Sequence, residues 1–167
     1  RWYHRCRDEG LRVGWLSLEP EDAPVEVFLD YALAALGQPA GGSGAAMPPT
    51  RRAAVSRLLA ATLVDERRTL LFLDDYDRLG GVLDDLVRLL VERAAPRLHL
   101  VIGSRLQPEI GLAELRAKGL VTELGPAELR LGFREAQALV TTSGRRNITE
   151  GDLALLLQRT EGWPIAL

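Results

Sequence analysis

The stretch Leu70-Leu71-Phe72-Leu73-Asp74-Asp75 decides the expected fold of this chain. Its four consecutive apolar residues are typical of a strand buried on both faces, as in a parallel sheet covered by helices. Two carboxylates follow at the point where such a strand would end. Because ligands of open α/β sheets bind outside the carboxyl ends of the strands, Asp74 and Asp75 stand where charge can act on a ligand.

These six residues have both a functional and a purely structural interpretation. An apolar strand closed by Asp is the metal-binding strand of P-loop nucleotide hydrolases, known as Walker B. In that interpretation the first acid holds Mg²⁺ and the second orients or activates water. In the structural interpretation a buried strand reaches the surface in an acidic turn. The six residues alone do not favour one interpretation over the other.

Strands alternate with helical patterns on both sides of this stretch. The expected strands are 13–18, 70–75, 98–103 and 120–124, and the longer expected helices are 25–36, 51–68 and from 82 to before Pro96. This alternation predicts parallel βαβ units in an α/β core over residues 1–124. From Gly125 onward the pattern is wholly helical, with Thr149 and Asp152 placed as a capping pair. Residues 125–167 are therefore expected to form the start of a helical subdomain.

The composition excludes several classes of protein. The 167 residues are 47% hydrophobic and carry a formal net charge of −2, which is typical of a globular chain. No basic patch indicates nucleic-acid binding, so we expect no direct contact with DNA. No apolar run is long enough to cross a membrane. The single cysteine, Cys6, cannot form an intramolecular disulfide and suits the cytoplasm.

Two further stretches bear on a phosphate site. Gly41-Gly42-Ser43-Gly44 follows an expected helix and has no lysine nearby, since Lys118 is the only lysine in the chain. A phosphate-cradling loop should follow a strand and end in Lys and Ser or Thr, so we interpret 37–49 as a linker. Residues 1–9 resemble the tail of a helix, without an initiator Met or a signal peptide. We therefore expect the chain to be a piece of a longer protein.

Several segments, in order along the chain, resemble one family. They are Gly14-Trp15-Leu16-Ser17-Leu18, Leu73-Asp74-Asp75-Tyr76, Leu98-His99-Leu100-Val101-Ile102-Gly103-Ser104-Arg105, Leu112-Ala113-Glu114-Leu115-Arg116-Ala117-Lys118-Gly119, Glu123-Leu124 and Thr160-Glu161-Gly162-Trp163-Pro164. Together they resemble the nucleotide-binding module of the MalT-like, large LuxR-type transcriptional activators, which belong to the STAND class of signalling ATPases. The resemblance implies a P-loop NTPase-type sheet flanked by helices, followed by a helical lid.

The resemblance also implies a role for each candidate site residue. Asp74 would coordinate Mg²⁺, and Asp75 would position or activate the attacking water. Arg105 matches the sensor arginine that reads the terminal phosphate, a task that suits a planar guanidinium. Pro164 matches the proline of the lid that packs near the adenine, although a proline in the first turn of a helix is also an ordinary capping residue.

One element of the family pattern is absent from these residues: the phosphate-binding loop, which in the family lies upstream of residue 1. We therefore expect this chain alone to bind ATP poorly and to hydrolyse it negligibly. The strand that precedes this loop would lie between those at 98–103 and 120–124. Its absence should destabilise the sheet or cause self-association.

The sequence leaves alternatives at the level of function. In the intact protein, the resemblance implies that ATP with an unknown inducer favours an open, self-associating form, and that ADP favours a closed form. A binding or oligomerisation scaffold with the same fold but no turnover is the second interpretation. A phosphoacceptor receiver-like domain is a third. It is disfavoured because both acids lie on one strand and because Lys118 precedes the last expected strand.

Overall fold

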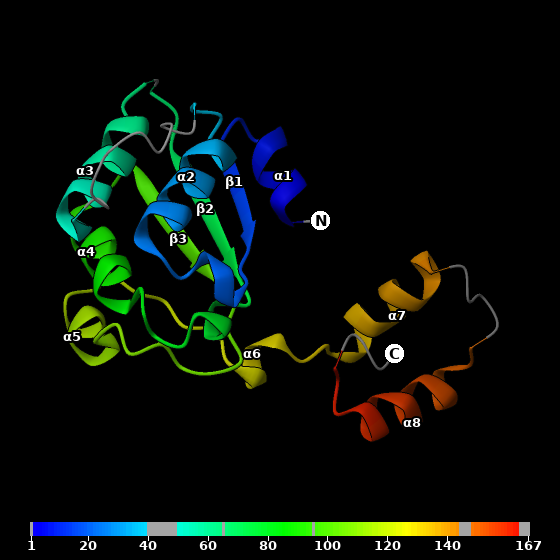
Figure 1. The fold of residues 1–167 in the computed structure, drawn as a ribbon. Coiled ribbons are helices and arrows are strands. Elements are labelled where there is room, and N and C mark those ends of the chain that lie inside the picture. Colours follow the sequence, from blue (N-terminus) through cyan, green and yellow to red (C-terminus); the bar gives the residue numbers. More distant parts are fainter. Residues whose placement is uncertain (1, 40–49, 65, 95, 144–147, 164–167) are drawn as a thin grey trace. The chain divides into compact units, whose positions relative to one another are not determined.

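The computed structural model describes residues 2–39, 50–64, 66–94, 96–143 and 148–163 (Figure 1). The chain divides into two compact units, Arg1–Val121 and Thr122–Leu167. Within the described residues, no helix is both long and apolar enough to cross a membrane.

The first unit contains a parallel sheet. Its strands are β1 (Arg12–Ser17), β2 (Thr69–Asp74) and β3 (Leu98–Ile102), in the spatial order β1-β2-β3. Trp15 pairs with Phe72, which in turn pairs with Val101. The stretch that contains the acid pair is thus the central strand, with a neighbour on each side. The expected α/β class is confirmed.

Three helices, α2, α3 and α4, cover one face of this sheet. The helices of the first unit are α1 (Trp2–Asp8), α2 (Val25–Ala35), α3 (Arg51–Ala61), α4 (Asp84–Ala94) and α5 (Leu112–Ala117), with short 3₁₀ turns η1 (Pro20–Asp22) and η2 (Tyr76–Leu79). Figure 1 shows α2, α3 and α4 on the same side of the three strands. Each of these helices follows a pattern of apolar residues at helical spacing, so one side of it can be buried.

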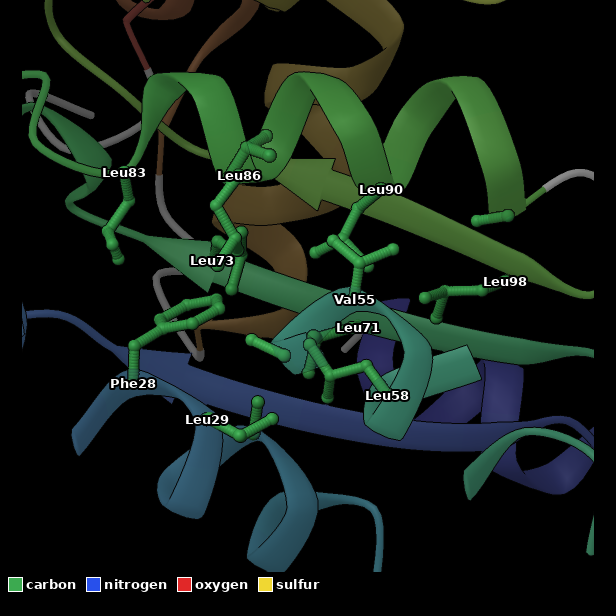
Figure 2. Close-up of a cluster of buried hydrophobic side chains, with 14 of the residues drawn as sticks. Phe28, Leu29, Val55, Leu58, Leu71, Leu73, Leu83, Leu86, Leu90 and Leu98 are labelled. Carbon is green, nitrogen blue, oxygen red and sulfur yellow. The ribbon is translucent and has the colours of Figure 1, made fainter. Parts of the chain in front are cut away.

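The hydrophobic core lies between those helices and the sheet. Leu71 and Leu73 of β2 point into it because alternate residues of a strand face the same side. Figure 2 shows them among side chains that the helices and their flanking residues contribute, including Phe28, Leu29, Val55, Leu58, Leu83, Leu86 and Leu90. Leu71 and Leu73 are both 0% exposed, so β2 is anchored along its length.

The opposite face of the sheet carries an aromatic cluster. The rings of Trp15 and Phe72 stack at 5.1 Å between centroids, and Trp2 of α1 meets Phe72 edge-on at 5.2 Å. Tyr3 of α1 meets Trp15 edge-on at 6.1 Å. Phe72 is 4% exposed, whereas Trp2 and Trp15 are 55% and 44% exposed. Helix α1 therefore shields β2 on this face but leaves its own aromatic residues half open to solvent.

The expected strand at 120–124 is wrong. These residues form neither helix nor strand in the structure, and the sheet of the described residues ends at β3. A strand requires a neighbour for its backbone hydrogen bonds, and β3 has only β2 as a pairing partner in the described chain. Leu120 and Val121 nevertheless pack against the core, which accounts for the apolar pattern.

Two helix boundaries also differ from those expected. Helix α3 ends at Ala61 instead of continuing to 68, and the hydroxyl of Thr62 donates to the carbonyl of Leu59 at 2.7 Å. Leu63, which lies within the expected helix 51–68, is 63% exposed. Helix α4 begins at Asp84, after the glycine-containing turn, and not at Val82. Both helices are therefore shorter than expected, and the buried Leu83 precedes α4.

The second unit is helical. It contains α6 (Pro126–Leu129), α7 (Phe133–Thr142) and α8 (Glu150–Thr160), and its buried cluster consists of Ala136, Val140 and Leu153 within the described residues. The capping pair is confirmed: the Thr149 hydroxyl oxygen accepts from the Asp152 amide at 3.2 Å.

Candidate functional site

The two candidate acids lie at the carboxyl end of the central strand. Asp74 is the last residue of β2, and Asp75 begins the turn into η2. Both are partly buried. The Asp75 amide donates to Asp74 Oδ1 at 3.2 Å, so one carboxylate oxygen of Asp74 is oriented by the backbone that follows it. The position agrees with the expectation from the sequence: a charged pair at the end of a buried parallel strand.

The backbone of Asp75 turns sharply away from the strand. Its φ and ψ are 54° and 39°, in the left-handed region that is uncommon for residues other than glycine, although Asn and Asp adopt it more often than most. Strained backbone of this kind is held in place by surrounding structure and gathers at functional sites. Here the conformation ends β2 at Asp74 and starts the turn into η2.

Gly103 brings the loop after β3 against the acid pair. Its amide donates to the Leu73 carbonyl at 2.8 Å, and its carbonyl accepts from the Tyr76 amide at 3.0 Å. A Cβ on Gly103 would lie 2.9 Å from Asp74 Oδ1, closer than such contacts occur, so a side chain here would displace the carboxylate. Glycine therefore permits the close approach of this loop to Asp74.

Arg105 leaves this loop on the same edge of the sheet. It is solvent-exposed. Its backbone amide donates to Asp77 Oδ1 at 3.0 Å, and the hydroxyl of Ser104 lies 3.4 Å from the same oxygen. The hydrogen bond from the Arg105 amide, followed by smaller contributions that include the positive charge of Arg105, lowers the pKa of Asp77 below its ordinary value. The structure thus places the acid pair at the end of β2 and Arg105 on the loop after β3, and Asp77 links the two segments through its hydrogen bond with the Arg105 amide.

A buried polar pair supports the far end of the same loop. The hydroxyl of Tyr76 donates to Asp84 Oδ1 at 2.8 Å, and the Glu109 amide donates to Asp84 Oδ2 at 2.8 Å. Tyr76 and Asp84 are 2% and 8% exposed. Burial is the largest cause that raises the pKa of Tyr76, with the Asp84 carboxylate adding to it. Both carboxylate oxygens of Asp84 are therefore satisfied in a position where an unpaired one would be costly.

Sequence reasoning missed several residues of this edge. Ser17 ends β1 and pairs in register with Asp74, and the Leu18 amide donates to the Asp74 carbonyl at 3.0 Å. Glu19 follows and lies 3.6 Å from Arg78. Ser17 could have been found from the sequence because it lies at the end of a predicted strand, and the ends of parallel strands meet at one edge of the sheet. Asp77 could have been found because it is the third acidic residue in the stretch Asp74-Asp75-Tyr76-Asp77.

The carboxylate oxygens at this edge suit a hard divalent cation that also binds water or phosphate. Carboxylate oxygens are the ligands that Mg²⁺ prefers, and Mg²⁺ commonly binds one or two carboxylates while retaining waters and substrate phosphates. Within the described chain, no group of three or more His, Cys, Asp and Glu residues could hold a metal ion. Asp74 and Asp75 supply two carboxylates of this ligand type at the end of β2. Pro164, the expected adenine contact, lies outside the described residues.

Comparison with known proteins supports the resemblance carried by the motifs. No protein-family model matches the chain. The chain is 29% identical over 164 residues to the HTH-type transcriptional regulator MalT of Klebsiella pneumoniae (strain 342), and 29% identical over 164 residues to MalT of Yersinia enterocolitica. Each match covers 93% of this chain but only 18% of the relative. This chain is therefore similar to MalT-type regulators along nearly its whole length, and it spans under a fifth of theirs.

Proposed function

We propose that these residues form the Walker B and sensor part of an ATP-binding switch in a transcriptional regulator of the MalT type. The observation that carries the proposal is the acid pair at the end of the central buried strand, with the Arg105 loop hydrogen-bonded beside it. The position matches the place where parallel α/β sheets bind ligands. Similarity to MalT regulators over 93% of the chain supports the regulatory context.

Each residue has a chemical task in this proposal. Asp74 holds Mg²⁺, which would neutralise phosphate charge when bound, and Asp75 positions or activates the attacking water. Asp74 ends β2 and Asp75 begins the turn into η2, so the proposal gives the two adjacent acids different partners. Arg105 is exposed on the adjacent loop, where its guanidinium can pair with a terminal phosphate. Pro164 would contact the adenine.

The switch works through a difference in affinity between two states. ATP together with an inducer would favour a self-associating form, and ADP would favour a closed form. Hydrolysis would end the active state, so a slow rate is compatible with the function. The resemblance further implies that a phosphate-binding loop outside residues 1–167 completes the site.

The test is binding of a fluorescent ATP analogue with Mg²⁺. It compares the 167-residue chain with a longer chain, extended upstream to include the phosphate-binding loop that the resemblance implies. We expect tight binding only by the longer chain. In that chain Asp74→Asn should weaken the Mg²⁺ dependence of binding, and Asp75→Asn should preserve binding but slow hydrolysis at least about 100-fold, as for loss of general-base catalysis.

Asp85→Asn is the matched control, because Asp85 is an exposed acid of α4 that lies 3.8 Å from Arg51. It should change neither binding nor hydrolysis. Unchanged Mg²⁺ dependence of binding in Asp74→Asn, together with unchanged hydrolysis in Asp75→Asn, would overturn the proposed site. Binding without hydrolysis in the unmodified longer chain would instead support the alternative, a non-catalytic scaffold with the same fold.

A further inference from the structure

The loop that carries Arg105 has little burial of its own. Residues Ser104 to Gln107 are all exposed. A segment with few buried apolar contacts opens easily unless hydrogen bonds hold it. Hydrogen bonds hold this loop at three places: Gly103 bonds to β2 and η2, the Arg105 amide bonds to Asp77, and the Glu109 amide bonds to Asp84.

We propose that Asp77 is a positioning residue that holds Arg105 beside the acid pair. Among the three attachments, the one at Asp77 acts on Arg105 itself and on its neighbour Ser104. The other two lie two residues before and four residues after Arg105. A sensor residue needs a fixed backbone because its guanidinium must meet the ligand in a narrow range of positions.

Asp77 is itself rigidly connected to the acid pair. It lies in η2, whose first turn begins at Asp75, where the Arg78 amide donates to the Asp75 carbonyl at 3.0 Å. The turn closes when the Gly80 amide donates to the Asp77 carbonyl at 3.2 Å. The backbone that bends Asp75 away from β2 thus also aims Asp77 at the loop after β3. A displacement of Asp75 would be transmitted to Arg105 through one short turn and one hydrogen bond.

The contact is charge-assisted. A carboxylate that accepts a backbone N–H forms a stronger hydrogen bond than a neutral acceptor does. The lowered pKa of Asp77 agrees with this geometry, because the hydrogen bond favours the ionised carboxylate. An asparagine at position 77 would keep an acceptor oxygen at the same place without the charge, and an alanine would remove the acceptor. These two substitutions therefore separate the acceptor from its charge.

The first arm of the test needs no nucleotide. It measures hydrogen exchange of the Arg105 amide by NMR in the 167-residue chain. We expect Asp77→Ala to speed exchange at Arg105 by about tenfold or more, the size expected for losing a hydrogen bond to a charged group. Asp77→Asn should give a smaller increase and shift the Arg105 amide resonance. Asp85→Ala, which removes an exposed acid of α4, should leave Arg105 unchanged.

The outcomes of this arm are decisive. Unchanged exchange at Arg105 in a folded Asp77→Ala chain would overturn the positioning role. If Asp77→Ala fails to fold, the Asp77→Asn chain decides: an Arg105 amide resonance that does not move would overturn the role. A general loss of protection across β2 would also count against it, because Asp77 would then support the whole sheet.

The second arm rests on the proposed nucleotide function and uses the longer chain. Asp77→Ala should weaken binding of MgATP while leaving MgADP within about twofold, as Arg105→Ala should. Arg105→Ala removes the contact to the terminal phosphate, and Asp77→Ala releases the backbone that positions this contact. The double variant should bind MgATP no more weakly than Arg105→Ala alone, because both changes act on one contact. If Asp77→Ala speeds amide exchange at Arg105 but neither Asp77→Ala nor Arg105→Ala weakens binding of MgATP, the sensor role of Arg105 is overturned. Asp77 then remains only the residue that orders the loop.

Discussion

At the scale of single residues, the side chain of Arg12 caps the carboxyl ends of two helices. Its Nε donates to the Leu36 carbonyl at 2.9 Å, and its Nη1 donates to the Ala61 carbonyl at 2.7 Å. These carbonyls lie at the carboxyl ends of α2 and α3, where no backbone amide of the same helix can reach them. A planar guanidinium serves both at once, and a lysine ammonium could not match its fork.

Replacing Arg12 should therefore destabilise the first unit. We expect Arg12→Met, which keeps the apolar stem, to lower the free energy of unfolding by about 1.5–3 kcal/mol, as for hydrogen bonds with a charged partner. Equilibrium urea unfolding measures the change. Arg5→Met is the control, since Arg5 pairs with Glu9 on the surface and its side chain is 78% exposed. Equal losses in the two variants would show that the helix ends do not depend on Arg12.

The sequence predicted the central acids of the candidate site but not the residues that hold them. Asp74 and Asp75 could be placed because a buried strand and its charged end are local in sequence. The contact of Asp77 with Arg105 spans 28 positions, and that of Asp84 with Glu109 spans 25. Such contacts depend on how two loops meet at the sheet edge, and no periodicity encodes that.

At the scale of elements, the sequence predicted the three strands and the helices of the core, but it also predicted a strand at 120–124 that does not form. Strands β1, β2 and β3 have apolar runs and also have each other as partners. Leu120 and Val121 share the apolar character, but they lack a neighbouring strand in the described chain. An apolar run shows that a segment is buried, whereas strand formation also depends on a partner elsewhere in the chain.

The hydrogen bond between Tyr76 and Asp84 joins the turn after β2 to the start of α4. Because of this contact, we expect the free energy of unfolding to fall as the pH rises through the alkaline range. Burial and Asp84 raise the pKa of Tyr76 in the folded chain. Above the ordinary pKa of tyrosine the unfolded chain loses this proton while the folded chain keeps it, so stability falls as the pH rises. The slope should approach about 1.4 kcal/mol per pH unit for one proton.

Urea unfolding at several values between about pH 8 and 11 tests this, with Tyr76→Phe as the comparison. The phenylalanine variant should be less stable near neutral pH, because Asp84 loses a donor in a buried place. Its stability should nevertheless fall less steeply than that of the parent chain as the pH rises. Parallel slopes would mean that Tyr76 ionises as readily in the folded chain as in the unfolded one.

At the scale of the whole molecule, the two compact units have cores of very different size. The first packs leucine, valine and phenylalanine side chains from its strands and helices into one cluster, whereas the described cluster of the second comprises Ala136, Val140 and Leu153. Burying a Val or Leu side chain contributes about 1.5–3 kcal/mol, while ordering each residue costs about 1–2 kcal/mol of backbone entropy. The second unit is therefore expected to be the less stable of the two.

Hydrogen exchange followed by mass spectrometry should show this difference directly. Peptides from α7 and α8 should exchange faster than peptides from β2, because opening the smaller cluster exposes less apolar surface. Leu153→Ala should accelerate exchange in α7 and α8 and leave β2 unchanged. Leu86→Ala, in the larger cluster, should accelerate exchange in β2. If Leu153→Ala also released β2, the two units would open as one cooperative body, and the division of the chain near residue 121 would not be a division in stability.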